Sequence, residues 1–361
     1  MAYSASMRKA IGEVRRAFAS VGLERQDPRF AQHGKHTPDT DAPTVLVACS
    51  GGRDSMALAA VSHIVCATLG IHCGAVIVDH QLQAGSRQVA RDAARRCEDL
   101  GLDPVTVRAI DVQDLHGGRS TEDVARQARY AAIVETARDD AAAVVLLAHT
   151  RDDQAETVAM DLMRSAGIDA LAGMPPVFER DGVRFLRPFL ELTRKQTTAI
   201  CGELGITWWD DPTNGDTMPA DQPLPESYPL RSRVRHTLMP YLSSFFNGDF
   251  PAHLAQSTEV ARADRDFLEV SADGLYGKAV CRNGEDTVVD MRVKPLAEAH
   301  PAIRRRVIAR VLAELGMAFT SSHVRSIEAL VTHWHGQGPV SLPSGYSANR
   351  QKHVIRVCKN G

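Results

Sequence analysis

Short apolar runs alternate with helical segments through the first half of the chain. The runs are Val45–Cys49, Ala75–Val78, Val105–Val107 and Val144–Ala148, and helical patterns near 55–69, 87–100, 120–138 and 153–165 separate them. Apolar runs of this length separated by helices are typical of βαβ units, in which the strands pair in parallel. We therefore predict an α/β fold with a parallel twisted sheet flanked by helices.

The segments on either side of this region follow other patterns. Residues 6–23 have apolar positions at helical spacing, and the polar stretch 24–43 reads as a mobile connector. Thr193–Leu204, Pro251–Val270 and Pro301–Leu315 read as helices, 216–229 as a loop, and 340–357 as short strands. We predict an N-terminal helix and linker at 1–42, the main domain at 43–246, and a small C-terminal α/β domain at 247–361.

Composition narrows the classes of protein that fit. No apolar run approaches the ~20 residues of a membrane helix, and charges interrupt the first twenty residues, so we expect a cytoplasmic protein without a membrane partner. A mitochondrial transit peptide is a weaker alternative, because Arg8, Lys9, Arg15 and Arg16 follow a helical pattern. The seven cysteines include no C-x-x-C pair, which argues against a zinc site or an iron–sulfur cluster bound by local spacing. The net charge is −2, but basic residues outnumber acidic ones from 217 onward, which is compatible with a polyanionic partner there.

The first apolar run leads directly into Ser50-Gly51-Gly52-Arg53-Asp54-Ser55, and an apolar helix follows. In a parallel sheet this junction lies at the edge where ligands bind. Glycines let the backbone approach an anion, and the N–H groups of a helix start favour phosphate. Asp54 would repel phosphate unless a Mg²⁺ ion lay between them. The motif is not a Walker A loop, because the lysine of that motif is absent. The alternative to phosphate binding is that these residues only cap the start of the helix.

These six residues resemble the S-G-G-x-D-S loop of the N-type ATP pyrophosphatases, or PP-loop enzymes. The resemblance implies that ATP is split between its α and β phosphates to give an adenylated intermediate. It makes Ser50, Gly51, Gly52, Arg53, Asp54 and Ser55 ATP-binding residues, with Asp54 as the Mg²⁺ ligand. Val78-Asp79-His80-Gln81-Leu82 is similar to the family's V-D-H-x-L, which places Asp79 and His80 beside the nucleotide.

Two later segments resemble the lysidine synthases within this family. Ala125–Tyr130 is similar to their A-R-x-x-R-Y element, which implies that Arg126 and Arg129 face ATP and the reacting base; a solvated helix face is the alternative. In 147–157, the carboxylates Asp152, Asp153 and Glu156 crowd one helical turn next to His149. Helix capping alone explains acids at a helix start, whereas the resemblance implies binding of lysine by Asp153, Glu156 and His149.

The resemblance covers roughly 45–245, and the C-terminal part is similar to a small tRNA-binding domain. It implies that the wobble cytidine of tRNA(Ile) with a CAU anticodon is adenylated and then attacked by free lysine. Asp54, Arg129, Asp153 and Glu156 are then the catalytic candidates. Basic clusters supply the candidates for contact with tRNA, namely Arg231, Arg233, Arg235, Arg304 and Arg305.

Some positions depart from the family pattern, and other functions stay open. Thr150 stands where a second histidine is common, and Ser232 where asparagine is usual. Trp208 and Trp209 are candidates for stacking on a base, although core burial is expected of at least one of them. The alternatives are a tRNA thiolation enzyme on the same fold, which would need paired cysteines, and a non-catalytic RNA-binding protein.

Overall fold

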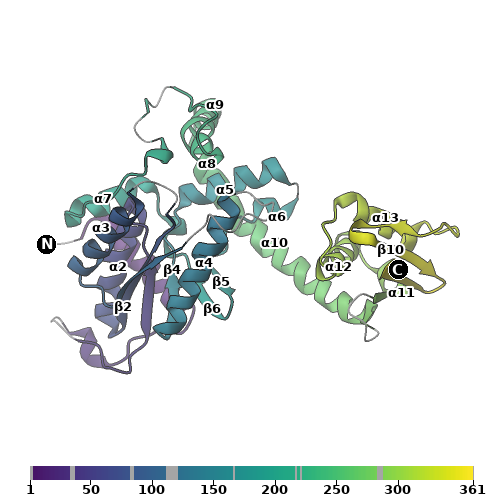
Figure 1. Ribbon diagram of the computed structural model, residues 1–361, viewed down its shortest axis with the longest axis horizontal. Coiled ribbons are helices and arrows are strands. Elements are labelled where there is room, and N and C mark those ends of the chain that lie inside the picture. The colour runs from purple at the N-terminus through teal and green to yellow at the C-terminus, as the bar shows by residue number, and fades with distance from the viewer. Residues whose placement is uncertain are drawn as a thin grey trace. The chain divides into compact units, whose positions relative to one another are not determined.

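The structure is a computed structural model that describes most of the chain. The described residues are 3–32, 37–81, 85–110, 121–165, 167–215, 218–219, 222–282 and 288–360, without the side chains of 121–123. The chain divides into two compact units, Met1–Glu259 and Val260–Gly361. The division falls inside the long helix α10 (Phe250–Ala279), labelled in Figure 1.

A six-stranded sheet is the centre of the first unit. Its strand order is β3-β2-β1-β4-β6-β5, and every neighbouring pair is parallel except β5 with β6. The strands are β1 (Thr44–Ala48), β2 (His72–Asp79), β3 (Val105–Ala109), β4 (Ala142–Leu146), β5 (Val177–Arg180) and β6 (Val183–Leu186). The α/β class expected from the alternating pattern is therefore confirmed. Because β1 is central, the loop that follows it lies in the middle of the sheet's carboxyl edge.

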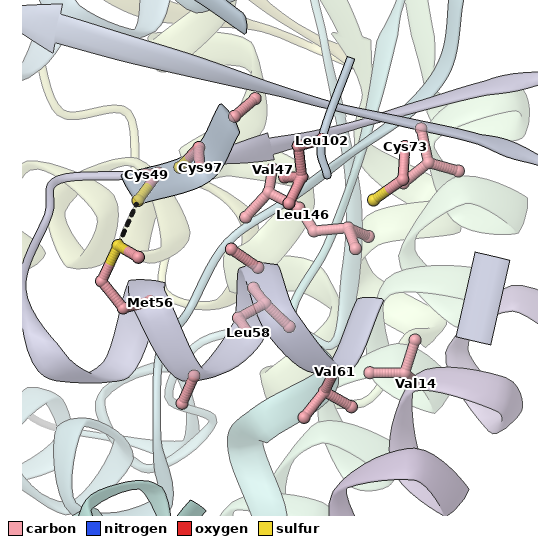
Figure 2. Close-up of a cluster of buried hydrophobic side chains, with 14 of the residues drawn as sticks. Val14, Val47, Cys49, Met56, Leu58, Val61, Cys73, Cys97, Leu102 and Leu146 are labelled. Atoms are coloured by element: carbon pink, nitrogen blue, oxygen red, sulfur yellow. Dashed lines mark hydrogen bonds between the residues drawn. The ribbon is translucent and has the colours of Figure 1, made fainter. Parts of the chain in front are cut away.

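Helices cover both faces of this sheet (Figure 1). Alternate residues of β1 pack against helices on opposite faces. Val45 and Val47 pack into a core with α1 (Ala5–Ala19), α2 (Arg53–Leu69), α3 (Ser86–Asp99) and α7 (Arg194–Leu204). Leu46 packs on the other face against α4 (Thr121–Asp139). Figure 2 shows part of the first core, where Val47, Cys49, Met56 and Leu58 lie together. This period of two is what a strand buried on both faces produces.

The segment after α1 is partly packed, which corrects the expectation of a mobile connector there. Phe30, in the 3-10 turn η1 (Pro28–Ala31), is 2% exposed and lies against Gly70 at the end of α2. Gln26 N donates a hydrogen bond to Leu69 O at 2.8 Å. Residues 24–32 are thus attached to the main domain, while 33–36 fall outside the described residues.

Shorter elements complete the first unit around the carboxyl edge of the sheet. Helix α5 (Arg151–Arg164) packs through Ala155 and Ala159 against Val234 and Met239. The segment that carries those two residues is nearly continuous helix with a π-helical turn in its middle. The remaining elements are α6 (Ile168–Leu171), η3 (Pro188–Glu191), η4 (Pro212–Asn214), α8 (Leu230–Arg233), η5 (Val234–Leu238) and α9 (Met239–Phe246).

The second unit is built on an antiparallel sheet of order β7-β8-β11-β10-β9. Its elements are β7 (Val280–Arg282), β8 (Val288–Arg292), α11 (Val293–Glu298), α12 (Pro301–Glu314), α13 (Ser321–Thr332), β9 (Val340–Ser341), η6 (Pro343–Gly345), β10 (Tyr346–Gln351) and β11 (Val354–Lys359). Its core joins Ile308 and Ile327 of the helices to Met291 and Ile355 of the sheet. No helix in the described part of the chain combines the length and hydrophobicity needed to cross a bilayer.

Candidate active site

The turn between β1 and α2 is held tightly by its own serines and glycines. Ser55 Oγ donates to Gly52 O at 2.9 Å and accepts from Ser50 N at 3.2 Å. Gly51 has a φ of +78°, and a Cβ there would lie 2.8 Å from Ala93 Cβ, so only glycine fits. Gly52 is the N-cap of α2. The loop therefore presents the positive end of a 17-residue helix at the sheet edge, which favours an anion.

A cleft of about 590 Å³ opens over this loop. Its volume lies in the range typical of small-molecule sites. The cleft brings together most of the ATP-site residues expected from the sequence: Ser50, Gly52, Arg53, Asp54, Ser55, Asp79, His80, Arg126 and Arg129, and also His149 and Arg235. Arg126 and Arg129 lie on an exposed side of α4 that faces the cleft. This position is compatible with the expected contact of both arginines with ATP and the base, which stays a prediction.

Asp54 is the acidic residue of the phosphate loop itself, and two arginines lie near its carboxylate. Its carboxylate accepts a hydrogen bond from Thr197 Oγ1, with Arg53 Nε at 3.2 Å and Arg194 Nε at 3.9 Å. Asp79, Asp210 and Asp211 also line the cleft. The described residues hold no preformed cluster of three or more metal-ligating side chains. Mg²⁺ commonly binds through one or two carboxylates and the phosphates of its substrate, so Asp54 fits a shared site of that kind.

Asp153 and Glu156 lie together on the first turns of α5, and both are buried. Thr150 is the N-cap of this helix, and Asp153 Oδ2 accepts from both Thr150 N and Thr150 Oγ1 at 2.8 Å. Asp153 therefore does cap the start of α5, as the alternative to lysine binding predicted. Glu156 is 1% exposed and Asp153 is 8% exposed. Among the described residues that line the cleft, neither carboxylate is present.

Three arginines converge on these two carboxylates. Arg194 donates to Asp153 Oδ1 at 2.6 Å and to Glu156 Oε1 at 2.7 Å. Arg231 Nε lies 2.9 Å from Glu156 Oε2, and Arg235 Nε lies 2.9 Å from Glu156 Oε1. Arg194 also approaches Asp54, so the phosphate loop and the acidic turn of α5 are linked through one guanidinium. Arg235 lines the cleft and therefore connects the buried cluster to it.

The charges in this cluster hold both carboxylates in the ionised form. Burial opposes ionisation, but Arg194 and the other arginines outweigh it and keep the pKa of Asp153 well below its usual range. The pKa of Glu156 is lowered for the same reason, against the effect of its burial. Groups with such low pKa values are weak proton acceptors near neutral pH. Asp153 and Glu156 are therefore suited to bind charge and poorly suited to the role of general base.

His149 is held in one tautomer by a buried arginine. Arg187, which is 6% exposed, donates from Nε to His149 Nδ1 at 3.2 Å and from Nη1 to Pro175 O at 2.6 Å. Burial, and then the charge of Arg187, lower the pKa of His149 to about 3. The imidazole is neutral, so its proton is on Nε2. A neutral ring whose Nδ1 already accepts a bond offers a donor to the cleft, which suits a substrate oxygen better than the lysine ammonium expected from the sequence.

The segment that carries Arg231 and Arg235 has an unusual helical geometry. A π-helical turn, η5, follows α8 directly, and such turns often occur at functional sites. Ser232 is 6% exposed and donates to Thr213 O at 2.8 Å, so this departure from the family pattern is accommodated by a local bond. Arg233 is half-buried and does not line the cleft. Its contact with tRNA stays a prediction.

Both tryptophans are half-buried, so the expected core burial of at least one is not found, and they lie in different surroundings. Trp208 packs against the core of the first unit, and its Nε1 donates to Asp210 Oδ1 at 2.7 Å. Trp209 lines the cleft, and its backbone N donates to Gly51 O at 2.9 Å. Only Trp209 is placed where a substrate base can reach it.

The arginines expected to contact tRNA in the second unit are held by one glutamate. Arg304 is 6% exposed and donates to Glu328 Oε1 at 2.8 Å and to Ala299 O at 3.0 Å. Its buried position does not fit the expected contact with phosphate, because it joins α12 to α13 in the interior. The Arg305 side chain is 53% exposed and lies 2.6 Å from Glu328 Oε2. Arg305 therefore keeps an accessible guanidinium.

Sequence reasoning missed Arg194, Arg187 and Thr197 as site residues. Arg194 follows Thr193, whose side chain caps α7 together with Gln196, so this stretch resembles an ordinary helix start. Arg187-Pro188-Phe189-Leu190 follows the order of segments in the lysidine synthases, but that resemblance gave Arg187 no role, and Arg194 carried no signal beyond its place in a predicted helix. Their partners are about 40 residues away along the chain, and the fold alone brings them together.

Comparisons with known proteins agree with this geometry. Residues 25–242 match the PP-loop domain family, and residues 291–357 match the TilS substrate binding domain. A tRNA(Ile)-lysidine synthase of Bifidobacterium longum subsp. infantis is 52% identical over 387 residues, covering 100% of this chain and 99% of the relative. Relatives with the same name in Leifsonia xyli and Streptomyces coelicolor are 41% and 39% identical, over 95% and 86% of this chain and 98% and 84% of their own lengths.

A solved structure supports the fold independently of sequence. The U34-tRNA thiolase NcsA from Methanococcus maripaludis with its [4Fe-4S] cluster has a TM-score of 0.52 and 12% sequence identity, covering 71% of this chain and 78% of that chain. At that identity the likeness concerns the fold alone.

Proposed function

The chain belongs to the tRNA(Ile)-lysidine synthase family of PP-loop enzymes, and from this premise we propose how its residues perform that reaction. ATP and the wobble cytidine of a tRNA(Ile) with a CAU anticodon meet in the cleft above the Ser50–Ser55 loop. The O2 oxygen of cytosine attacks the α-phosphorus of ATP, and pyrophosphate leaves. The side-chain amine of free lysine then attacks C2 of the activated ring, AMP leaves with that oxygen, and the product is lysidine.

The observation that carries this proposal is the cleft itself, where a glycine loop at a helix N-terminus and four arginines line the same space. Arg53, Arg126, Arg129 and Arg235 all line it together with that loop. Negative charge grows on the phosphates as pyrophosphate leaves, and fixed cations and N–H dipoles stabilise it. Mg²⁺ bound at Asp54 and the phosphates would neutralise further charge there. Arg129 and Arg126, on the α4 wall, are assigned to the adenylate and the base.

His149 adds a donor to the same cleft. Its Nε2–H is held in place by Arg187, and it is directed at an acceptor such as the adenylate phosphate or the cytosine carbonyl. A fixed neutral donor stabilises charge that develops on an oxygen without losing its proton.

For lysine we propose binding next to the acidic turn of α5. Asp153 and Glu156 provide negative charge, and the arginines that surround them provide sites for the carboxylate of the amino acid. Because three guanidiniums already contact the two carboxylates, an ammonium group must displace one of them. Of the three arginines, Arg235 lines the cleft. We therefore propose that the ammonium group of lysine displaces Arg235 from the carboxylates. The amine loses its proton to solvent or substrate rather than to these ionised carboxylates.

Pyrophosphate and AMP release, measured with each substrate omitted in turn, tests this function. The proposal predicts pyrophosphate release that requires both ATP and tRNA, and AMP release that also requires lysine. A thiolation enzyme would instead require a sulfur donor, and an RNA-binding protein would release neither product. Release of AMP that is independent of lysine, or dependent on a sulfur donor, would contradict the proposal.

A further inference from the structure

The last part of the second unit holds an exposed aromatic ring on a stretch of chain that carries no acidic residue, although one of its arginines, Arg356, pairs with Asp290 of β8. Trp334, in the loop after α13, is 40% exposed, and residues 332–336 are all exposed. From residue 329 to residue 361 the sequence contains no Asp or Glu, whereas it contains Arg350, Lys352, Arg356 and Lys359. An aromatic surface within a positively charged setting is the combination that binds single-stranded nucleic acid.

One face of the Trp334 ring is covered by a fixed cation. The Arg350 guanidinium carbon lies 4.4 Å from the ring centroid. Arg350 Nη1 donates to Leu330 O at 2.7 Å, and its Nε donates to Lys352 O at 3.0 Å. The guanidinium is therefore anchored to the backbone of both neighbouring elements, and the ring resting on it is held at a defined position.

The loop that carries the ring is also ordered by internal bonds. Gln337 Oε1 accepts from His335 N at 2.8 Å, and His335 Nδ1 lies 3.1 Å from His333 O. The same arrangement brings Lys352 close to the platform, because its carbonyl accepts from Arg350. A preorganised aromatic ring loses little conformational entropy on binding, which makes it a more effective contact than a mobile side chain.

We propose that Trp334, supported by Arg350, is a stacking platform for one unpaired nucleotide of the tRNA, with Lys352 next to its phosphate. The inference rests on the proposed function, from which it takes the RNA substrate. It assigns recognition in the second unit to a base contact and a neighbouring lysine, instead of the buried Arg304. A nucleobase fits because every base has a flat face for the ring, and no carboxylate of the 329–361 segment opposes the phosphate.

The test measures the affinity of the full-length protein for unmodified tRNA(Ile) with a CAU anticodon at several salt concentrations. Trp334→Ala is expected to weaken binding roughly 10-fold to 100-fold without changing the salt slope, because stacking releases no counterions. Trp334→Phe is expected to restore most of that loss. Lys352→Ala is expected to weaken binding and lower the salt slope by about one. Far-ultraviolet circular dichroism of each variant checks that the second unit is folded.

A fluorescence measurement and a kinetic readout complete the test. Stacking on a base quenches tryptophan emission, so tRNA should quench the wild type more than Trp334→Phe. Lysidine formation by Trp334→Ala should show a raised KM for tRNA and an unchanged kcat. If the wild type forms no lysidine, the proposed function fails, while the binding data still test the platform. Equal tRNA affinity of wild type and a folded Trp334→Ala would overturn the platform.

Discussion

Neutralising Glu156 tests how the arginines near the active site are held in place. Glu156 is 1% exposed and accepts from Arg194, Arg231 and Arg235 at 2.7, 2.9 and 2.9 Å. In Glu156→Gln the new amide keeps one acceptor oxygen but turns an NH₂ group toward guanidinium donors. Asp153 alone then faces three cations. Removing one partner from a buried ion pair costs about 3–5 kcal/mol, and we expect a loss of that size in the first unit.

Urea unfolding measures this loss in a Trp334→Phe background. The chain has three tryptophans, and Trp208 and Trp209 then report on the first unit alone. With a denaturant dependence of about 1–3 kcal/mol per molar, the midpoint should fall by at least roughly 1 M. The matched control is Asp161→Asn on the same helix, which should change stability by no more than about 0.5 kcal/mol. A Glu156→Gln midpoint equal to that of the control would show that the arginines are held by other contacts.

The pH dependence gives a second check of the same reasoning. The folded-state pKa values of Asp153 and Glu156 are lowered, so their stabilisation is fully present above the ordinary carboxylate pKa of about 4. It is lost as the pH falls below that value toward the folded pKa. Glu156→Gln should therefore lose less stability than the wild type between pH 5 and pH 3.

Three further changes test other parts of the account. Asp54→Asn should reduce tRNA-dependent pyrophosphate release by roughly 100-fold or more with unchanged unfolding, since it removes charge beside the phosphates; near-normal release would exclude Asp54 from the reaction. His149 has a folded pKa of about 3, below its ordinary value of about 6.5, so the wild type should lose about 2 kcal/mol between pH 7 and pH 5 that His149→Asn does not lose; parallel stability curves would contradict this. Arg304→Met should destabilise the second unit by about 3 kcal/mol, because Glu328 is left buried with one partner, whereas half-exposed Arg305→Met should cost less than about 1 kcal/mol; equal effects measured by circular dichroism would refute the distinction.

The central strands of the first unit's sheet could be predicted because β1 and β2 are buried on both faces and their sequences are mainly apolar. Val45–Ala48 and the helix after it have the apolar patterns of buried elements, so the sequence predicted that both exist. It did not predict the order of the strands in the sheet. For other elements, the local sequence predicted the wrong bounds. Helix α10 continues past Gly274 and Gly277, where propensity predicts an end, because Leu275, Tyr276 and Ala279 pack into the core of the second unit.

Only part of the active site could be predicted from the sequence, because some of its residues are neighbours along the chain and others are brought together by the fold. The loop at Ser50–Ser55 and the acidic turn at Asp153 and Glu156 are local, so their residues can be recognised by spacing. The arginines that determine how those acids behave come from segments 38 to 79 residues away. Spacing shows that two carboxylates are neighbours, but only the fold shows that they are buried, paired and ionised. That difference changes the expected role from proton acceptor to binding site.

The central claim is that the cleft above the glycine loop joins lysine to an adenylated cytidine. Mass spectrometry of nucleosides is the most direct test, using tRNA(Ile) incubated with the protein, ATP and isotope-labelled lysine. The account predicts that one cytidine per tRNA is replaced by a nucleoside carrying the lysine label, and that Asp54→Asn forms this nucleoside at least roughly 100-fold more slowly. ATP-dependent tRNA modification without the label, or no modified nucleoside from the folded wild type, would contradict it.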